Sequence, residues 1–127
     1  MATLPIVDAR APGITLSSPA RRIAQTLPRG LSVVLGSDEA GTATLTMTVD
    51  RATARKLRLD RRARGPVVVG MLSSAVTSGS RTVPINFTAK ARRALRSVRL
   101  VKVLVTAVVT DAAGNRSTRT LRVTLRR

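Results

Sequence analysis

Hydrophobic and polar residues alternate in the C-terminal part of the chain with a period of two, which is typical of β-strands. One such run extends over Val101–Thr110 and a second over Thr120–Arg126. The residues between them include Asp111, Gly114 and Asn115, which favour a tight turn. Together these features predict an antiparallel β-hairpin with one buried face.

The turn residues predict the register of this hairpin. Asp111 suits the first position of a type I turn, and Gly114 suits the left-handed position that closes a three-residue loop. Such a loop pairs Asp111 with Asn115, whereas a two-residue loop would set Val105 against Arg122. The predicted facing pairs are Val105 with Leu121, Val103 with Val123 and Val101 with Leu125. The same turn could offer oxygen ligands to Ca²⁺, but one carboxylate is too few for such a site, so we favour the turn.

Earlier in the chain, shorter segments carry a similar pattern. The predicted strands are Gly13–Ser17, Leu31–Leu35, Thr42–Val49, Val67–Met71 and Thr82–Phe87. Apolar residues alternate with threonines in Thr42–Val49, as in an antiparallel strand with one buried face. Val67–Met71 is apolar on both faces, which predicts a strand that is deeply buried or lies between two layers. Within it, Gly70 indicates a bulge or a close approach, and Pro84 predicts an edge strand because it cannot donate a backbone hydrogen bond.

Two segments change from the strand period to a helical one. Arg51–Leu59 follows Asp50, and Ala89–Ser97 follows Thr88, so each begins after a residue that caps helices well. Both are predicted to be short helical inserts. Arg21–Leu27 has no clear period, and it fits either an edge strand or a loop.

These elements predict an all-β fold, an Ig-like antiparallel β-sandwich of about seven strands with two short helical inserts. A length of 127 residues suits one domain. We assign residues 13–127 to the sandwich and residues 1–12 to a linker or flexible N-terminus, because Pro5 and Pro12 flank small and polar residues. No signal peptide and no membrane span are predicted from the hydropathy pattern.

The composition narrows the chemistry that the chain can perform. It contains neither cysteine nor histidine, which excludes thiol catalysis and removes the commonest metal ligand and general base. Asp38 and Glu39 are the only adjacent acidic residues, and neighbours on a strand point to opposite faces. Phe87 is the only aromatic residue, which disfavours binding of sugars or single-stranded nucleic acid by stacking. We therefore expect no enzyme activity, no catalytic residue, no metal and no cofactor.

The net charge of +17 has two interpretations, and both stay open. Lysine occurs only at Lys56, Lys90 and Lys102, so nearly all of the cations are arginines. Such a skew fits codon use that favours Arg, Ala, Val and Thr. It also fits a polyanionic partner, such as nucleic acid or an acidic cell-wall polymer. The candidate polyanion-binding residues lie on the two inserts: Arg55, Lys56, Arg58, Arg61, Arg62, Arg64, Arg92, Arg93, Arg96 and Arg99.

Several segments resemble bacterial immunoglobulin-like domains of actinobacterial secreted or surface proteins. The resemblance extends over residues 8–126 and is carried by Thr110–Asn115, Arg51–Leu57, Lys90–Leu95 and the opening Asp8–Pro19. It implies a repeated module that acts as a spacer, stalk or adhesive unit in an extracellular or cell-surface protein. The implied partners are neighbouring domains of a longer chain or identical subunits. Relatives carry a cysteine pair around the turn that here runs from Gly36 to Gly41, and this chain lacks that pair.

Two other functions are kept as alternatives to the structural module. The first is a basic module that binds polyanions through the inserts. The second is a subunit of a self-assembling filament, since the edge strand near Pro84 and the N-terminal strand could pair with a neighbouring chain.

Overall fold

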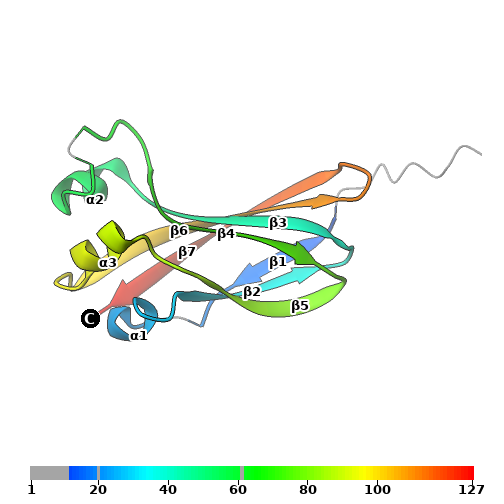
Figure 1. The fold of residues 1–127 in the computed structure, drawn as a ribbon, viewed down its shortest axis with the longest axis horizontal. Coiled ribbons are helices and arrows are strands. Elements are labelled where there is room, and N and C mark those ends of the chain that lie inside the picture. The colour runs from blue at the N-terminus through cyan, green and yellow to red at the C-terminus, as the bar shows by residue number, and fades with distance from the viewer. Residues whose placement is uncertain (1–11, 20, 61) are drawn as a thin grey trace, which may run out of the picture.

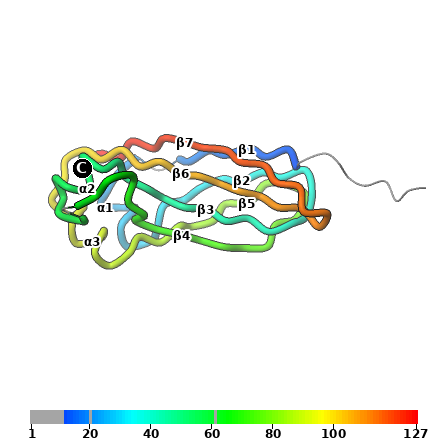
Figure 2. The backbone as a smooth tube through the Cα atoms, turned by 90° about the horizontal axis from the view of Figure 1, so that it is seen from above, coloured from blue at the N-terminus to red at the C-terminus, as the bar shows by residue number. Residues whose placement is uncertain are grey.

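The computed structural model describes residues 12–19, 21–60 and 62–127, which form two antiparallel sheets packed face to face. The three-stranded sheet has the order β1 (Ile14–Ser17), β2 (Leu31–Ser37) and β5 (Gly79–Ile85). The four-stranded sheet has the order β4 (Val67–Val76), β3 (Gly41–Val49), β6 (Leu100–Asp111) and β7 (Arg116–Arg126). Figures 1 and 2 show the two layers extending along one long axis. The predicted all-β sandwich is confirmed.

Residues 1–11 of the predicted linker lie outside the described part of the chain. Pro12, its last residue, is buried, and its carbonyl oxygen accepts a hydrogen bond from Ser117 Oγ. Gly13 N donates to Asp38 Oδ1 over 2.7 Å. The sandwich therefore holds the chain from Pro12 onward, one residue before the predicted boundary.

Alternation along the strands builds the core. In β3, Ala43, Leu45, Met47 and Val49 are buried, while the threonines between them lie on the other face. Strand β6 adds a second row of inward residues, and β2 supplies the opposing layer. The buried residues of these two strands are Val101, Val103, Val105, Ala107 and Val109 in β6 and Leu31, Val33 and Leu35 in β2. Each buried Val or Leu stabilises the fold by about 1.5–3 kcal/mol, so aliphatic packing is the main source of stability.

The C-terminal hairpin has the predicted register. Val105 faces Leu121 and Val103 faces Val123. The turn closes through Asp111 N, which donates to Asn115 O over 2.9 Å, and Gly114 N, which donates to Asp111 O over 3.1 Å. Gly114 has a φ of 88°, the left-handed conformation that the three-residue loop requires.

The prediction that Val67–Met71 is deeply buried or lies between two layers is wrong. Strand β4 extends to Val76 and lies at the edge of the four-stranded sheet, where Val68 and Met71 are 47% and 59% exposed. Opposite Met47 and Thr48 of β3, strand β4 has a bulge at Val69, which has no facing residue. The side chains of β4 change faces at this bulge. Apolar residues on both faces here reflect an edge strand with an aliphatic outer surface.

Gly70 and Pro84 have the roles that the sequence predicts. A Cβ at Gly70 would lie 2.5 Å from Asn86 O and would also collide with Met47 Cε, so the residue marks a close approach beside the bulge. Gly70 also forms an isolated bridge with Phe87, which joins the edges of the two sheets. Strand β5 is an edge strand, and Pro84 is exposed on it.

The described part of the chain contains three short helices, where two were predicted. Helices α2 (Arg51–Lys56) and α3 (Ala89–Leu95) are the predicted inserts. Asp50 Oδ1 caps α2 by accepting from Thr53 N over 2.7 Å, and Thr88 Oγ1 caps α3 by accepting from Ala91 N over 3.2 Å. Both caps satisfy amides that the first helical turn leaves without partners.

The additional helix, α1 (Ile23–Thr26), lies in the segment predicted as an edge strand or loop. Leu27 N donates to Ile23 O over 3.0 Å, and the side chains of both residues are buried. Residues four apart share a helix face, so burial of this pair selects a helical turn that is too short to show a period in the sequence. Pro28 follows at once and favours its end.

Along the chain, connections that contain a helix alternate with tight turns. The helices lie at one end of the sandwich and the tight turns at the other. Each strand runs along the long axis, so every second connection lies at the same end (Figure 1). We call the end that holds α1, α2 with residues 57–60 and 62–65, α3 with residues 96–99, and the C-terminal Arg126 and Arg127 the helical pole. The end that holds the β2–β3, β4–β5 and β6–β7 turns is the hairpin pole.

Candidate polyanion-binding surface

The two basic inserts meet at the helical pole. Residues after α2 and residues of α3 line one shared hollow with a volume of about 480 Å³. Its apolar wall comes from Leu57, Leu59 and Ala94, and its cations are Arg58, Lys90 and Arg93. The inserts adjoin because two strands, β4 and β5, separate them, and an even number of strands returns the chain to the same end.

Arg55 has a structural role within this surface. Its Nε and Nη2 donate to Ala63 O over 3.0 and 2.6 Å, which fixes the loop after α2 with the buried Ala63 beneath it. A planar guanidinium can direct two of its N–H donors at one carbonyl oxygen, whereas an ammonium group acts as a single point charge. Arg55 therefore contributes its charge to the surface while part of its hydrogen-bonding capacity holds the loop.

Arg58 ends helix α2 in an unusual conformation for an arginine. Its φ is 58°, and it is the only non-glycine residue with positive φ among the described residues. Arg58 N donates to Arg55 O over 3.1 Å, and Leu59 N donates to Ala54 O over 2.9 Å. This pair of bonds is the Schellman motif that closes helix C-termini, usually with glycine at the left-handed position. The bend leaves the Arg58 side chain exposed on the helical pole.

The remaining predicted cations lie on the same pole, apart from Arg61, which falls outside the described residues. Lys56 is the last residue of α2. The other cations lie on the loop after α2, on α3 or directly after α3. Those that are described and exposed are Arg62, Arg64, Arg92, Arg93, Arg96 and Arg99. The last turn of α3 contains Arg92 and Arg93, and the last turn of α2 contains Arg55 and Lys56. Positive charge at these positions interacts favourably with the carbonyl groups at the helix C-terminus.

Sequence reasoning missed a further set of cations at this pole. They are Arg21, Arg22, Arg29, Arg126 and Arg127. Backbone hydrogen bonds hold the C-terminal cations at this pole. Arg126 N donates to Arg21 O over 2.8 Å, and Arg127 N donates to Arg99 O over 2.9 Å. The number of predicted strands between two segments could have identified these cations, because segments separated by an even number of strands lie at the same pole.

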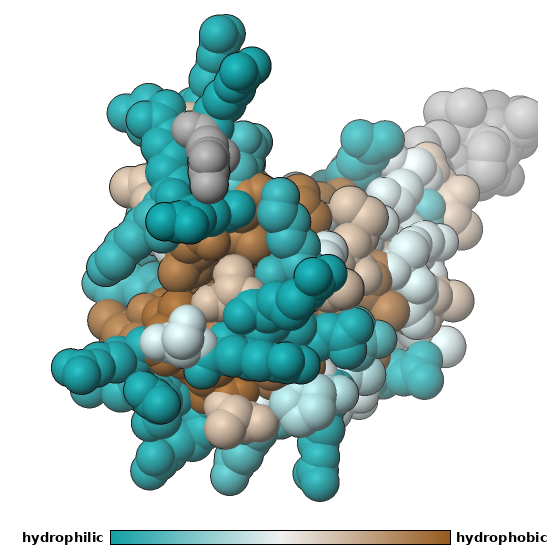
Figure 3. Space-filling view, turned by 60° about the vertical axis from the view of Figure 1, so that its left-hand side comes forward, coloured by the Kyte–Doolittle hydropathy of each residue, from teal (hydrophilic) through white to brown (hydrophobic). Residues whose placement is uncertain are grey.

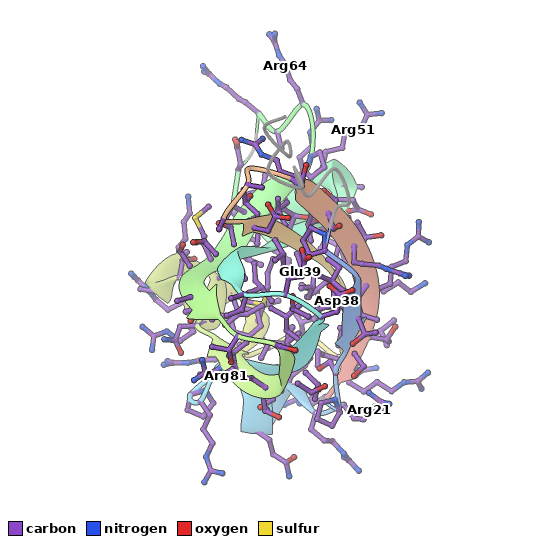
Figure 4. All side chains as sticks on the ribbon, turned by 90° about the vertical axis from the view of Figure 1, so that its right-hand side faces the viewer. Arg21, Asp38, Glu39, Arg51, Arg64 and Arg81 are labelled. Carbon is purple, nitrogen blue, oxygen red and sulfur yellow. The ribbon has the colours of Figure 1, made fainter. Side chains whose placement is uncertain are left out.

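The acidic residues that the structure describes divide between the poles. Asp38, Glu39 and Asp111 lie around one hollow at the hairpin pole, and Figure 4 shows Asp38 and Glu39 near the middle of that end, with labelled arginines extending away from it. The described acids of the helical pole are Asp50 and Asp60. Asp60 Oδ1 accepts from Arg62 N over 2.9 Å, and hydrogen bonds from the side chain and backbone of Thr53 lower the pKa of Asp50. Both carboxylates support backbone turns.

The hairpin-pole acids also hold backbone structure. Burial raises the pKa of Asp111, but hydrogen bonds from Asn115 and from the backbone of Ala113 more than offset it, so this pKa lies below its usual value. The described residues contain no group of three or more acidic, histidine or cysteine side chains arranged to hold a metal ion. The geometry of Asp111 and Asn115 is that of the predicted turn.

The surface of the helical pole combines charge with recessed apolar residues. Figure 3 shows long hydrophilic side chains at this end with apolar residues visible between them. Such a surface attracts anions over about a Debye length, roughly 8–10 Å at physiological salt.

No protein-family model matches the chain, and no curated protein matches it significantly. Among the described residues, none of the helices is long and apolar enough to cross a membrane.

Proposed function

We propose that this chain is a non-catalytic structural module, a spacer or stalk unit of a bacterial extracellular or cell-surface protein. One observation carries the proposal: the described chain enters at the hairpin pole and leaves at the helical pole (Figure 1). Pro12 and Gly13 are held there by Ser117 and Asp38, and Arg127 N is held at the other end by Arg99 O. Domains connected through opposite poles extend an array by their full length.

The strands that carry the two ends support the same function. Force applied between the ends runs along β1, which pairs antiparallel with β2, and along β7, which pairs antiparallel with β6. Both ladders would be loaded parallel to the strands, so several hydrogen bonds must break together. A stalk needs this resistance to extension.

Single-molecule force spectroscopy tests the proposal. The chain has no cysteine, so cysteines introduced at Gly13 and Arg127 give unique attachment points. We expect a higher unfolding force in this geometry than with attachment at Ser78 and Ala112, which both lie at the hairpin pole and load the sheet by peeling. Equal or lower force along the chain ends would contradict a stalk function.

The convergence of both basic inserts at the helical pole favours a second function, binding of polyanions. Cations that flank α1, together with those of α2, α3 and the C-terminus, contribute to one end, and the two described acids there cap or support turns. Neutralising several phosphates at once gives binding that weakens steeply as salt rises. Duplex DNA and a teichoic-acid-like polymer are the partners that this charge suits.

Titration of both polymers at low and physiological salt tests this second function. The variant R58Q/R62Q/R64Q removes three charges from the helical pole. R81Q/R116Q/R119Q removes the same charge from β5 and β7, away from that pole. We expect the first variant to weaken binding more than the second. Equal losses of affinity in the two variants, or complete loss of binding by the native protein at physiological salt, would show that binding depends only on the net charge of the chain.

A further inference from the structure

Helices α1 and α3 enclose a second hollow at the helical pole, with a volume of about 410 Å³. Its apolar lining consists of Ile23, Ala24, Leu27, Pro28 and Val98, and we call the buried Ile23 and Leu27 its floor. This volume and lining fall in the range of small-molecule sites, which are mostly apolar with a few polar groups that orient the ligand.

The apolar floor is recessed. Ile23 and Leu27 are 3% and 8% exposed, because one face of α1 packs into the core of the sandwich. Ala24 and Pro28 are exposed and form the part of the wall nearest solvent. A guest that enters the hollow therefore contacts aliphatic carbon on several sides.

Three cations surround this floor. Arg92 and Arg96 are four residues apart, at the end of α3, so both extend from the same side of the helix toward the hollow. Arg127 lines the hollow from the C-terminal end of the chain, and its backbone oxygen accepts from Arg22 Nη1 over 3.4 Å. The hollow is therefore apolar inside and positive at its opening.

We propose that this hollow binds a small amphiphilic anion with a single alkyl chain and a phosphate or carboxylate head group. The alkyl chain lies on Ile23, Ala24 and Leu27, and the head group lies between Arg92 and Arg96. Guanidinium groups match both kinds of head group because their parallel N–H donors form paired bonds to two oxygens.

The recess favours a soluble amphiphile over a bilayer. The cations are exposed, whereas Ile23 and Leu27 lie below them. A flat anionic membrane would contact the arginines and leave the floor empty. A single detached chain can enter the hollow and remove the apolar surface from water.

Calorimetric titration with decyl phosphate below its micelle-forming concentration tests the site. R92Q/R96Q should weaken binding by about tenfold or more, since each arginine contributes charge-assisted hydrogen bonds. R62Q/R64Q, which makes the same change in charge at the same pole but outside the hollow, should leave binding within about twofold. Equal losses in the two variants would overturn the proposal.

A second pair of variants tests the floor. A24W fills the hollow from α1, whereas A52W places the same side chain at an exposed position of α2 that does not line it. We expect A24W to abolish binding of decyl phosphate and A52W to preserve it. Both are compared with the native protein by thermal melting, so that a loss of fold is recognised.

Three probes separate this site from simple attraction of charge. Inorganic phosphate should bind much more weakly than decyl phosphate, and decyltrimethylammonium should not bind. Binding to anionic vesicles should be the same for A24W and A52W. Equal affinity for inorganic phosphate, or binding to vesicles without binding to decyl phosphate, would overturn the proposal and leave a surface for anions or membranes.

Discussion

Asp111 and Asn115 close the β6–β7 hairpin through both backbone and side chain. Asp111 N donates to Asn115 O over 2.9 Å, and Asn115 N donates back to Asp111 Oδ1 over 2.8 Å. The amide of Asn115 also donates from Nδ2 to Asp111 Oδ2 over 3.2 Å. The carboxylate of Asp111 thus organises the turn at the hairpin pole in its ionised form.

This relationship predicts a specific dependence of stability on pH. The pKa of Asp111 is lower in the folded chain than its usual value, so its contribution is present above the unfolded pKa, about 4, and is lost as pH falls through the folded value. D111N should lower the melting temperature near neutral pH, and its difference from the native protein should shrink toward about pH 2. A difference that stays constant with pH would exclude a role for the charge.

A methyl group at Gly70 should destabilise the sandwich. In G70A the new Cβ would collide with Met47 Cε and Asn86 O at the bulge, and the backbone oxygen cannot move away easily. The expected loss is about 1–3 kcal/mol in free energy of unfolding. Urea denaturation measures it, with G65A as the control, because a Cβ at Gly65 meets no atom within 4 Å. Equal losses in the two variants would contradict the packing argument.

Glycine at position 58 should stabilise the end of helix α2. Arg58 has a left-handed backbone, which costs a residue with a side chain about 1–2 kcal/mol relative to glycine. R58G should therefore raise the free energy of unfolding by up to about 1 kcal/mol, while R58Q, which changes only the charge, should not. An equal increase in both variants would assign the effect to charge repulsion among the cations of the pole.

Lysines on the outer surface of β4 should reduce association between molecules. Val68 and Met71 expose aliphatic surface on the outer face of the edge strand β4, where a second molecule can pack. V68K/M71K should lower light scattering at high protein concentration, with little change in melting temperature because both side chains are already exposed. The control T44K/T46K places two lysines on β3, an inner strand of the same sheet. If the native chain forms filaments through this edge, the β4 variant should prevent them and the β3 variant should not.

Much of the fold could be predicted because strand alternation and turn chemistry agree. The β6–β7 register follows from the period of two and from Gly114, and the inserts follow from the caps Asp50 and Thr88. Helix α1 could not be predicted, since a helical turn of four residues is selected by burial of Ile23 and Leu27 and not by local propensity. The position of β4 was also hidden, because apolar residues on both faces do not distinguish an edge strand from an inner one.

The candidate surface was predicted only in part. The sequence identified the cations of the inserts, but their convergence with Arg126 and Arg127 depends on which strands lie between them. Arg55 illustrates a second limit: its bonds to Ala63 O depend on the path of a loop that no periodicity describes. Residue type indicated positive charge, and topology determined where it gathers.

The concentration of cations at the helical pole, opposite the three described acids of the hairpin pole, has a consequence for orientation. On a negatively charged wall the domain would stand upright, with its helical end down and its long axis perpendicular to the wall. The β6–β7 turn and the first described residue would then face outward. A chain attached to Pro12 would rise from the wall instead of lying along it.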